Sequence, residues 1–184
     1  MQILAGRFRG RRVRSTPTRS VRPCSSRVKK SIFDTLAVRL SFDDITVLDL
    51  FAGFGTLGFE ALSRGAGTVC FVEQQYEVVQ ALRSTAAELR VGAAVRLAKT
   101  DVLSFLHNQA GVFDLVFCDP PYAWSDYEGL IGMVFAGGFV AADGWMLVEH
   151  EVQLDFSSLP HYAFHKDYGM TRITFFHRVE TEEE

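Results

Sequence analysis

Four consecutive residues in the middle of the chain, Asp119-Pro120-Pro121-Tyr122, place an acid, two prolines and an aromatic ring directly after a predicted strand. The two prolines stiffen the loop and lack N–H groups, so its carbonyl oxygens can point outward. An amino group on an aromatic ring is a poor nucleophile because its lone pair is delocalised. Hydrogen bonds to the Asp119 carboxylate and the Pro120 carbonyl would direct that lone pair and stabilise the positive charge developing on nitrogen.

This loop therefore predicts group transfer to the exocyclic amine of a nucleic-acid base. Tyr122 can stack on the base, as aromatic side chains do in single-stranded recognition. The base must be unpaired or flipped out to reach such a pocket. A proline turn that only ends the strand is the structural alternative, although it needs neither the acid nor the ring.

A glycine-rich segment earlier in the chain has the pattern Gly-x-Gly-x-x-Gly, between a predicted strand and a predicted helix, over residues 53–58. Glycines at these places permit a tight turn and let a ligand approach the backbone. Glu73 ends the next predicted strand, where a carboxylate can accept hydrogen bonds from both hydroxyls of a ribose. Dinucleotide sites and S-adenosylmethionine sites share these features.

Two further acids favour S-adenosylmethionine over a dinucleotide. Asp49 precedes the glycine loop, where it can meet the ammonium group of S-adenosylmethionine but would repel a pyrophosphate. Asp101 follows the third predicted strand and can accept a hydrogen bond from the amino group of adenine. The structural alternatives are that Asp49 orders the loop, that Asp101 caps a helix, and that Glu73 is a surface acid.

Strand-like and helix-like segments alternate from residue 45 onward. We expect strands at 45–50, 68–73, 95–98, 113–118 and 144–150, a helix ending near Gly65, and further helices at 76–90, 102–108 and 127–135. The last two strands, at 162–166 and 171–176, form a hairpin around Gly169. This order predicts a doubly wound, mostly parallel α/β sheet with an antiparallel edge. Ligands bind at the carboxyl ends of such strands, where Glu73, Asp101, Asp119 and the glycine loop fall.

Basic residues are concentrated at the start of the chain. Residues 1–30 contain ten Arg or Lys and no acid, whereas the rest carries 9 basic and all 22 acidic residues. A basic arm on an acidic body favours a polyanion contact, and a solvated tail is the alternative. Apolar residues that can anchor the arm, and glycines typical of turns, argue against a disordered tail: Ile3, Leu4, Gly6, Phe8, Gly10 and Val13.

Composition excludes several classes of protein. The 184 residues fit one domain, which we divide into a basic extension (1–40), a catalytic domain (41–179) and an acidic tail (180–184). No apolar run reaches the roughly 18 residues of a membrane span, and no signal sequence is evident. Three cysteines without metal-binding spacing fit reduced thiols in the cytoplasm. We therefore expect a cytoplasmic monomer without a metal site.

With these motifs in order, the sequence resembles the class I methyltransferases and, more closely, the bacterial 16S ribosomal RNA (guanine(966)-N(2))-methyltransferase family of the RsmD type. The matching segments run from Ile3-Leu4-Ala5-Gly6 and Arg22-Pro23 through Asp49–Gly58, Glu60–Ala66 and Phe71-Val72-Glu73 to Phe113–Tyr122 and Tyr168-Gly169. The resemblance implies a Rossmann-like seven-stranded sheet, an N-terminal β-hairpin that docks RNA, and a guanine substrate in an assembled or assembling 30S subunit.

Site residues follow from the resemblance position by position. S-adenosylmethionine would contact Asp49, Phe51, Gly53, Gly55, Glu73, Asp101 and Val102. Methyl transfer would use Asp119, Pro120, Pro121 and Tyr122. The ribosomal RNA would contact Arg7, Arg9, Arg22 and Arg27.

The sequence departs from the family pattern at Cys24, Ser26 and Lys30, which bear on substrate contacts, and at Phe54, which is large for the glycine loop and would narrow or cover the cofactor pocket. Three rival functions stay open on the residues alone. They are methylation of adenine N6 in RNA or DNA, an NAD-dependent oxidoreduction, and non-catalytic RNA binding or assembly by the same fold.

Overall fold

The structure is a computed structural model that describes residues 1–16, 26–121 and 123–179. Its seven strands form one sheet in the order β3-β2-β1-β4-β5-β7-β6. The strands are β1 (Thr46–Leu50), β2 (Thr68–Glu73), β3 (Val95–Lys99), β4 (Phe113–Cys118), β5 (Val140–Glu151), β6 (Tyr162–Tyr168) and β7 (Thr171–His177). The first five are parallel, and β7 runs antiparallel to both β5 and β6. The predicted doubly wound sheet with its antiparallel hairpin is confirmed.

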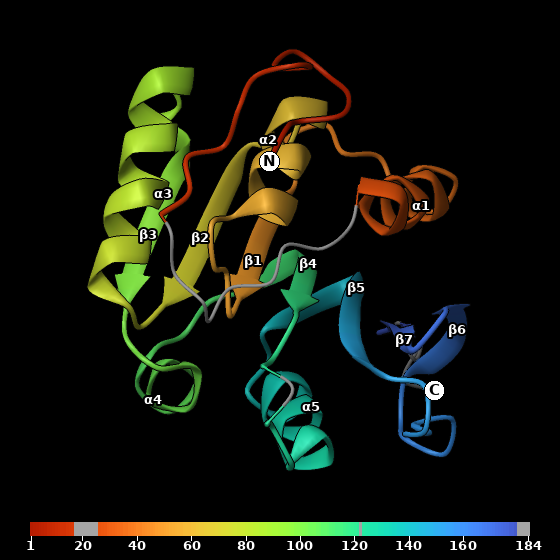
Figure 1. The fold of residues 1–184 in the computed structure, drawn as a ribbon. Coiled ribbons are helices and arrows are strands. Elements are labelled where there is room, and N and C mark those ends of the chain that lie inside the picture. Colours follow the sequence, from red (N-terminus) through yellow and green to blue (C-terminus); the bar gives the residue numbers. More distant parts are fainter. Residues whose placement is uncertain (17–25, 122, 180–184) are drawn as a thin grey trace.

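Helices cover both faces of this sheet (Figure 1). Helices α1 (Ser26–Ala37), α2 (Thr56–Arg64) and α3 (Tyr76–Leu89) lie on one face, and α4 (Val102–Asn108) and α5 (Tyr127–Ala136) lie on the other. A short 3₁₀ turn, Gly92–Ala94, leads into β3.

The strand β4 shows why its sequence is apolar at nearly every position. Leu115 and Phe117 join the core under α1–α3, while Val116 and Cys118 join the core under α4 and α5. A strand between two helical layers buries both of its faces, so it cannot alternate polar and apolar residues.

The predicted elements match the structure closely except at two places. Helix α4 and strand β4 have the predicted bounds, but β5 begins at Val140, four residues earlier than expected. The sequence prediction also lacks α1, which buries Ile32, Phe33 and Leu36 in the core. The basic residues around this helix mask its apolar stripe. The division of the chain at residue 40 stays a prediction.

The N-terminal segment folds back on itself and packs against α2. Gln2 and Arg12 form an isolated antiparallel bridge, and Ile3 and Val13 are buried in the core. Gly6 has φ +78, and a Cβ there would lie 1.8 Å from the Ser63 carbonyl oxygen, so only glycine permits this approach. The expected β-hairpin is thus present with a single bridge. Within the described residues, no helix is long and apolar enough to cross a membrane.

Candidate active site

Four carboxylates mark the carboxyl edge of the sheet, one from each of four neighbouring strands. Glu73 ends β2, Asp49 lies near the end of β1, Asp119 follows β4, and Glu149 lies near the end of β5. Because the sheet order is β2-β1-β4-β5, the four acids follow one another across this edge. The structure therefore brings together acids that lie up to 100 residues apart in the chain.

The glycine loop between β1 and α2 is held in an unusual backbone conformation. Phe51, Gly53 and Gly55 all have positive φ, at 57°, 52° and 74°. A positive φ is rare for a residue with a side chain, and such residues cluster at ligand sites. Gly58, in the first turns of α2, lies so close to β2 that an added Cβ would meet the Phe71 ring at 2.3 Å. The glycines thus shape the turn and let α2 pack tightly on the sheet.

Asp49 is buried directly beneath this loop. Its Oδ2 accepts a hydrogen bond from the Gly58 N–H at 3.0 Å. Burial raises the pKa of Asp49 to about 8; the Gly58 hydrogen bond opposes the rise and the Glu73 charge adds to it. The structure therefore shows the loop-ordering role that was the alternative for Asp49. A buried carboxyl whose pKa is raised in this way is also suited to bind a cation.

Glu73 and Asp101 also bind backbone N–H groups. Glu73 accepts hydrogen bonds from Gly53 at 3.1 Å and Gln75 at 2.8 Å, and so connects β2 to the glycine loop. Asp101 caps α4 through the Ser104 N–H at 2.9 Å, and this bond lowers the pKa of the exposed Asp101 carboxyl. Val102, in contrast, is buried. Each carboxylate keeps further lone pairs that a ribose or an adenine can use.

The predicted catalytic loop starts at Asp119, immediately after the buried end of β4. Burial and the nearby charge of Glu149 raise the pKa of Asp119 well above its ordinary value. Pro120 is buried and Pro121 is exposed, and the Pro121 carbonyl accepts a hydrogen bond from the Trp124 N–H at 2.8 Å. Tyr122 lies outside the described residues.

Two residues at this site were not predicted from the sequence. Trp124 packs edge-on against Phe51 with ring centroids 5.1 Å apart, and so joins the catalytic loop to the glycine loop. Glu149 and Asp119 both line a small cavity, otherwise walled by Ile32, Leu57, Phe117, Cys118, Leu147 and Ile173. The position of Glu149 at the end of an apolar strand, like that of Glu73, is the signal that could have identified it.

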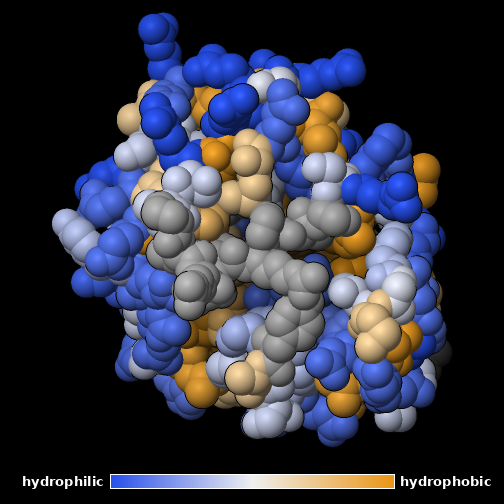
Figure 2. All heavy atoms as spheres, viewed as in Figure 1, coloured by the Kyte–Doolittle hydropathy of each residue, from blue (hydrophilic) through white to orange (hydrophobic). Residues whose placement is uncertain are grey.

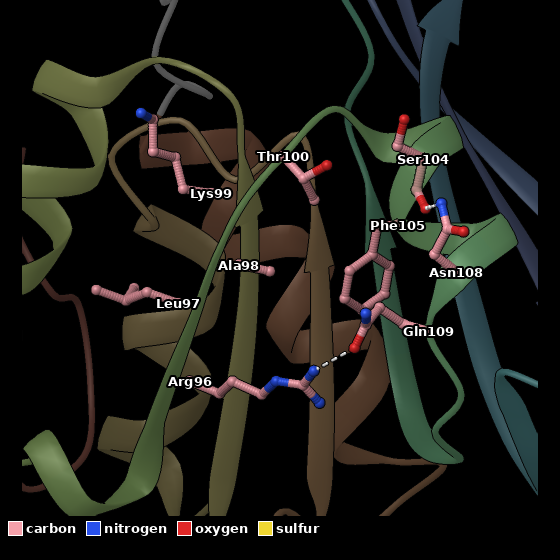
Figure 3. Close-up of a pocket in the computed structure, with 9 residues that line it drawn as sticks. All are labelled: Arg96, Leu97, Ala98, Lys99, Thr100, Ser104, Phe105, Asn108 and Gln109. Carbon is pink, nitrogen blue, oxygen red and sulfur yellow. Dashed lines mark hydrogen bonds between the residues drawn. The ribbon is translucent and has the colours of Figure 1, made fainter.

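A larger groove of about 300 Å³ lies away from the catalytic loop, between the edge strand β3 and α4 (Figure 3). Arg96 crosses it and donates a hydrogen bond to Gln109 at 2.7 Å. Thr100, at one end of its lining, precedes Asp101 in the chain. The groove is open and contains none of the four acids, so Asp119 stays the candidate reaction site despite the greater size of the groove.

The expected RNA contacts lie on the N-terminal segment and at the start of α1. Arg7, Arg9 and Arg27 are exposed, and Arg22 falls outside the described residues. Figure 2 shows strongly hydrophilic side chains gathered at the top of the molecule, where Figure 1 places the N-terminal segment. The described part of the chain contains no cluster of three or more His, Cys, Asp or Glu that could bind a metal ion.

Comparison with known proteins adds to this geometry. The family model described as Conserved hypothetical protein 95 matches residues 1–177. Ribosomal RNA small subunit methyltransferase D of Escherichia coli K12 is 32% identical over 168 residues, which cover 91% of this chain and 83% of that protein. The putative rRNA methyltransferase YlbH of Bacillus subtilis is 31% identical over 158 residues, which cover 84% of this chain and 85% of that protein.

Solved structures share the whole fold. A putative methyltransferase of Escherichia coli, yhhF, has a TM-score of 0.87 at 29% identity and covers 98% of this chain and 99% of its own. An RNA methyltransferase of Salinibacter ruber, solved with S-adenosyl-L-homocysteine, has a TM-score of 0.66 at 15% identity over 88% of this chain and 97% of its own, a likeness of fold alone.

Proposed function

The chain belongs to the Conserved hypothetical protein 95 family, and from this membership we propose that it transfers a methyl group from S-adenosylmethionine to the exocyclic N2 of a guanine in 16S ribosomal RNA. The observation that carries the proposal is the position of Asp119. Asp119 begins a Pro-Pro loop at the end of β4, and the glycine loop follows the neighbouring strand β1. Asp49 of β1 pairs with Phe117 of β4, so the two loops leave the sheet side by side. The relatives named as ribosomal RNA methyltransferases support the same conclusion.

The chemistry of the donor set fits S-adenosylmethionine. Glu73 offers a carboxylate for the ribose hydroxyls, and Asp49 offers a buried carboxyl for the ammonium group. The positive-φ loop from Phe51 to Gly55 lies at the same edge of the sheet, and Asp101 and Val102 would flank the place for adenine. When bound, this cofactor supplies an electrophilic methyl group on a sulfonium.

The residues of the catalytic loop prepare the amine for attack. Asp119 and the Pro120 carbonyl accept hydrogen bonds from the amino group and direct its lone pair toward the methyl donor. Methyl transfer gives the amine a positive charge, and the amine then loses one proton. Ionised Asp119 can accept that proton, and because its pKa is raised it holds the proton more readily than an ordinary acid does. Tyr122 would stack on the flipped base.

The basic N-terminal arm is the part of the chain that we propose binds the RNA substrate. We propose that residues 1–40 dock the RNA through Arg7, Arg9, Arg22 and Arg27, that the catalytic domain spans 41–179, and that 180–184 form an acidic tail. We further propose a cytoplasmic monomer that acts on an assembled or assembling 30S subunit. The segregation of basic residues into the first 30 positions supports the RNA contact.

The decisive experiment incubates the protein with 30S subunits, free 16S ribosomal RNA and duplex DNA, each with radiolabelled S-adenosylmethionine. The modified nucleotide is then mapped by reverse transcription and mass spectrometry. We expect label on one guanine as N2-methylguanine in the ribosomal samples. Label on adenine N6, or label only in DNA, would contradict the proposal. An Asp119→Ala variant serves as the control for contaminating activity.

A further inference from the structure

Glu149 lies beside Asp119 at the carboxyl edge of the sheet. Cys118, the last residue of β4, pairs with Val148 of the parallel strand β5. The residues that come next in the chain, Asp119 and Glu149, are therefore neighbours in the same register. Side chains alternate between the two faces of a strand. Phe117 and Leu147 belong to the core under α1–α3, and therefore Asp119 and Glu149, two residues later, face the same side.

The cavity between these two carboxylates is small and largely apolar. It holds about 10 Å³, roughly the space of one water-sized group. Its walls include Ile32 of α1 and Leu57 of α2. A cavity of this size is far too small for a base ring, so a base could place in it only a group about the size of a water molecule, such as an N–H on its edge.

The order of the strands puts Glu149 on the far side of Asp119 from the cofactor. The proposed cofactor residues Glu73 and Asp49 lie on β2 and β1, and Asp119 follows on β4. The next strand is β5, which carries Glu149. An amine held at Asp119 therefore has the methyl donor on one side and Glu149 on the other.

Among the bases that carry an exocyclic amine, only guanine has a ring N–H next to it. Guanine presents N1–H beside its 2-amino group. Adenine and cytosine present instead a ring nitrogen with a lone pair beside theirs. A carboxylate only accepts hydrogen bonds, so it attracts the first arrangement and repels the second.

We propose that Glu149 determines the specificity of the enzyme for guanine, by accepting the guanine N1–H while Asp119 holds the 2-amino group. This inference rests on the proposed function and deepens it, because it gives a physical reason for guanine over adenine. Burial, and after it the charge of Glu149, raises the pKa of Asp119, and the two donors on the guanine edge would stabilise both groups as ionised carboxylates, which only accept hydrogen bonds. With adenine, the Glu149 carboxylate would instead face the lone pair of the ring nitrogen beside the amino group.

The test compares guanine with 2-aminopurine, which keeps the 2-amino group but has a lone pair at N1. Small ribosomal subunits are assembled in vitro around RNA carrying one or the other base at the mapped position, and kcat/KM is measured for both. We expect the wild-type protein to prefer guanine by about 10- to 100-fold. In the Glu149→Gln variant the preference should fall at least fivefold, because glutamine can also donate to a ring lone pair.

Glu151→Gln is the matched control, since Glu151 is an exposed acid two residues along the same strand. The loss of O6 in 2-aminopurine affects all three proteins alike, so the change in the ratio isolates N1. An unchanged ratio of guanine to 2-aminopurine activity in Glu149→Gln would overturn the inference. This includes the case in which both activities fall equally while folding and cofactor affinity stay intact. The wild-type protein alone also tests the inference, because a ratio of guanine to 2-aminopurine activity near one would overturn it. A wild-type protein that leaves guanine unmethylated would instead refute the proposed function itself.

Discussion

Three of the predicted cofactor residues have a structural role before any ligand binds. Asp49 holds Gly58, Glu73 holds Gly53 and Gln75, and Asp101 caps α4. The loop-ordering and capping alternatives are therefore both observed, yet neither excludes ligand binding because each carboxylate has about four acceptor sites. Residue type and spacing located these acids from the sequence. The raised pKa of Asp49 was not predictable, since it depends on burial that only the packed structure provides.

Asp49 should make the ligand-free protein less stable as the pH rises. Its folded pKa of about 8 lies above the ordinary value near 4, so between these pH values the folded state holds a proton that the unfolded state has released. Each pH unit in this window costs up to about 1.4 kcal/mol. Asp49→Asn is neutral throughout, and its advantage in melting temperature over the wild-type protein should grow from pH 4 to pH 8. A difference that does not change with pH would contradict the buried, protonated carboxyl.

The same variant should lose cofactor affinity. The ionised form of Asp49 is the one that attracts an ammonium group, so the wild-type affinity for S-adenosylmethionine should increase as the pH rises toward 8. Asp49→Asn should bind weakly, with little dependence on pH. Isothermal calorimetry at several pH values measures both trends. A wild-type affinity that falls over this range would remove Asp49 from the ammonium site.

Asp119 should be required for methyl transfer but not for cofactor binding. Removing one group that stabilises developing charge typically lowers kcat by about 10²- to 10³-fold, and we expect at least this loss for Asp119→Ala. The affinity for S-adenosylmethionine should change less than threefold, because the cofactor residues lie on β1–β3 and in the loops that follow them. Single-turnover kinetics and calorimetry separate the two effects. An equal loss of affinity would place Asp119 in the cofactor site instead.

Among the helices and strands, the pattern of apolar residues predicted the sheet and most helices, because β1 and β4 are short, continuous apolar runs and α3 carries clear helical periodicity. Helix α1 was missed since its basic residues resemble those of the arm. Its buried Lys29 has a partner that no local pattern reveals, the fully buried Glu60 of α2, at 3.2 Å. Such a long-range ion pair appears only when the chain is folded.

Glu60 joins three separate segments of the chain. Besides Lys29 of α1, its carboxylate accepts hydrogen bonds from the backbone N–H groups of Leu4 and Ala5 at 2.8 and 3.0 Å, and from Arg64 at 3.0 Å. Removing its charge leaves the buried Lys29 with one partner fewer. We expect Glu60→Gln to lower the free energy of unfolding by about 3–5 kcal/mol, as for other broken buried pairs.

The control for Glu60 is Glu88, which pairs with Arg14 on the surface. Glu88→Gln should leave the free energy of unfolding nearly unchanged, because exposed pairs are screened by water. Urea titration followed by circular dichroism measures both variants. Equal costs for the two substitutions would show that the Glu60 network does not hold the N-terminal segment on α2.

In the whole molecule, the rest of the chain engages part of the basic charge of the N-terminal segment. The N-terminal segment packs on α2 and reaches α3, where Arg11 donates to the Glu88 carbonyl at 3.0 Å and Arg14 pairs with the Glu88 side chain. Arg7 and Arg9 stay exposed. The composition predicted a polyanion contact, but not which arginines would be engaged by the protein itself, since that depends on the packing of the arm.

Binding of the RNA should therefore depend on salt through the exposed arginines. Each phosphate contact releases counterions, so replacing Arg7 or Arg9 by Ala should reduce the slope of log affinity against log salt by about one and weaken binding to any RNA alike. Arg83→Ala, an exposed arginine of α3 outside the basic arm, should leave the slope nearly unchanged. Filter binding to 30S subunits from 50 to 300 mM KCl provides the slopes. A wild-type slope near zero would mean that the basic arm does not dock RNA, and the acidic body would then have to bind its substrate through the active-site edge alone.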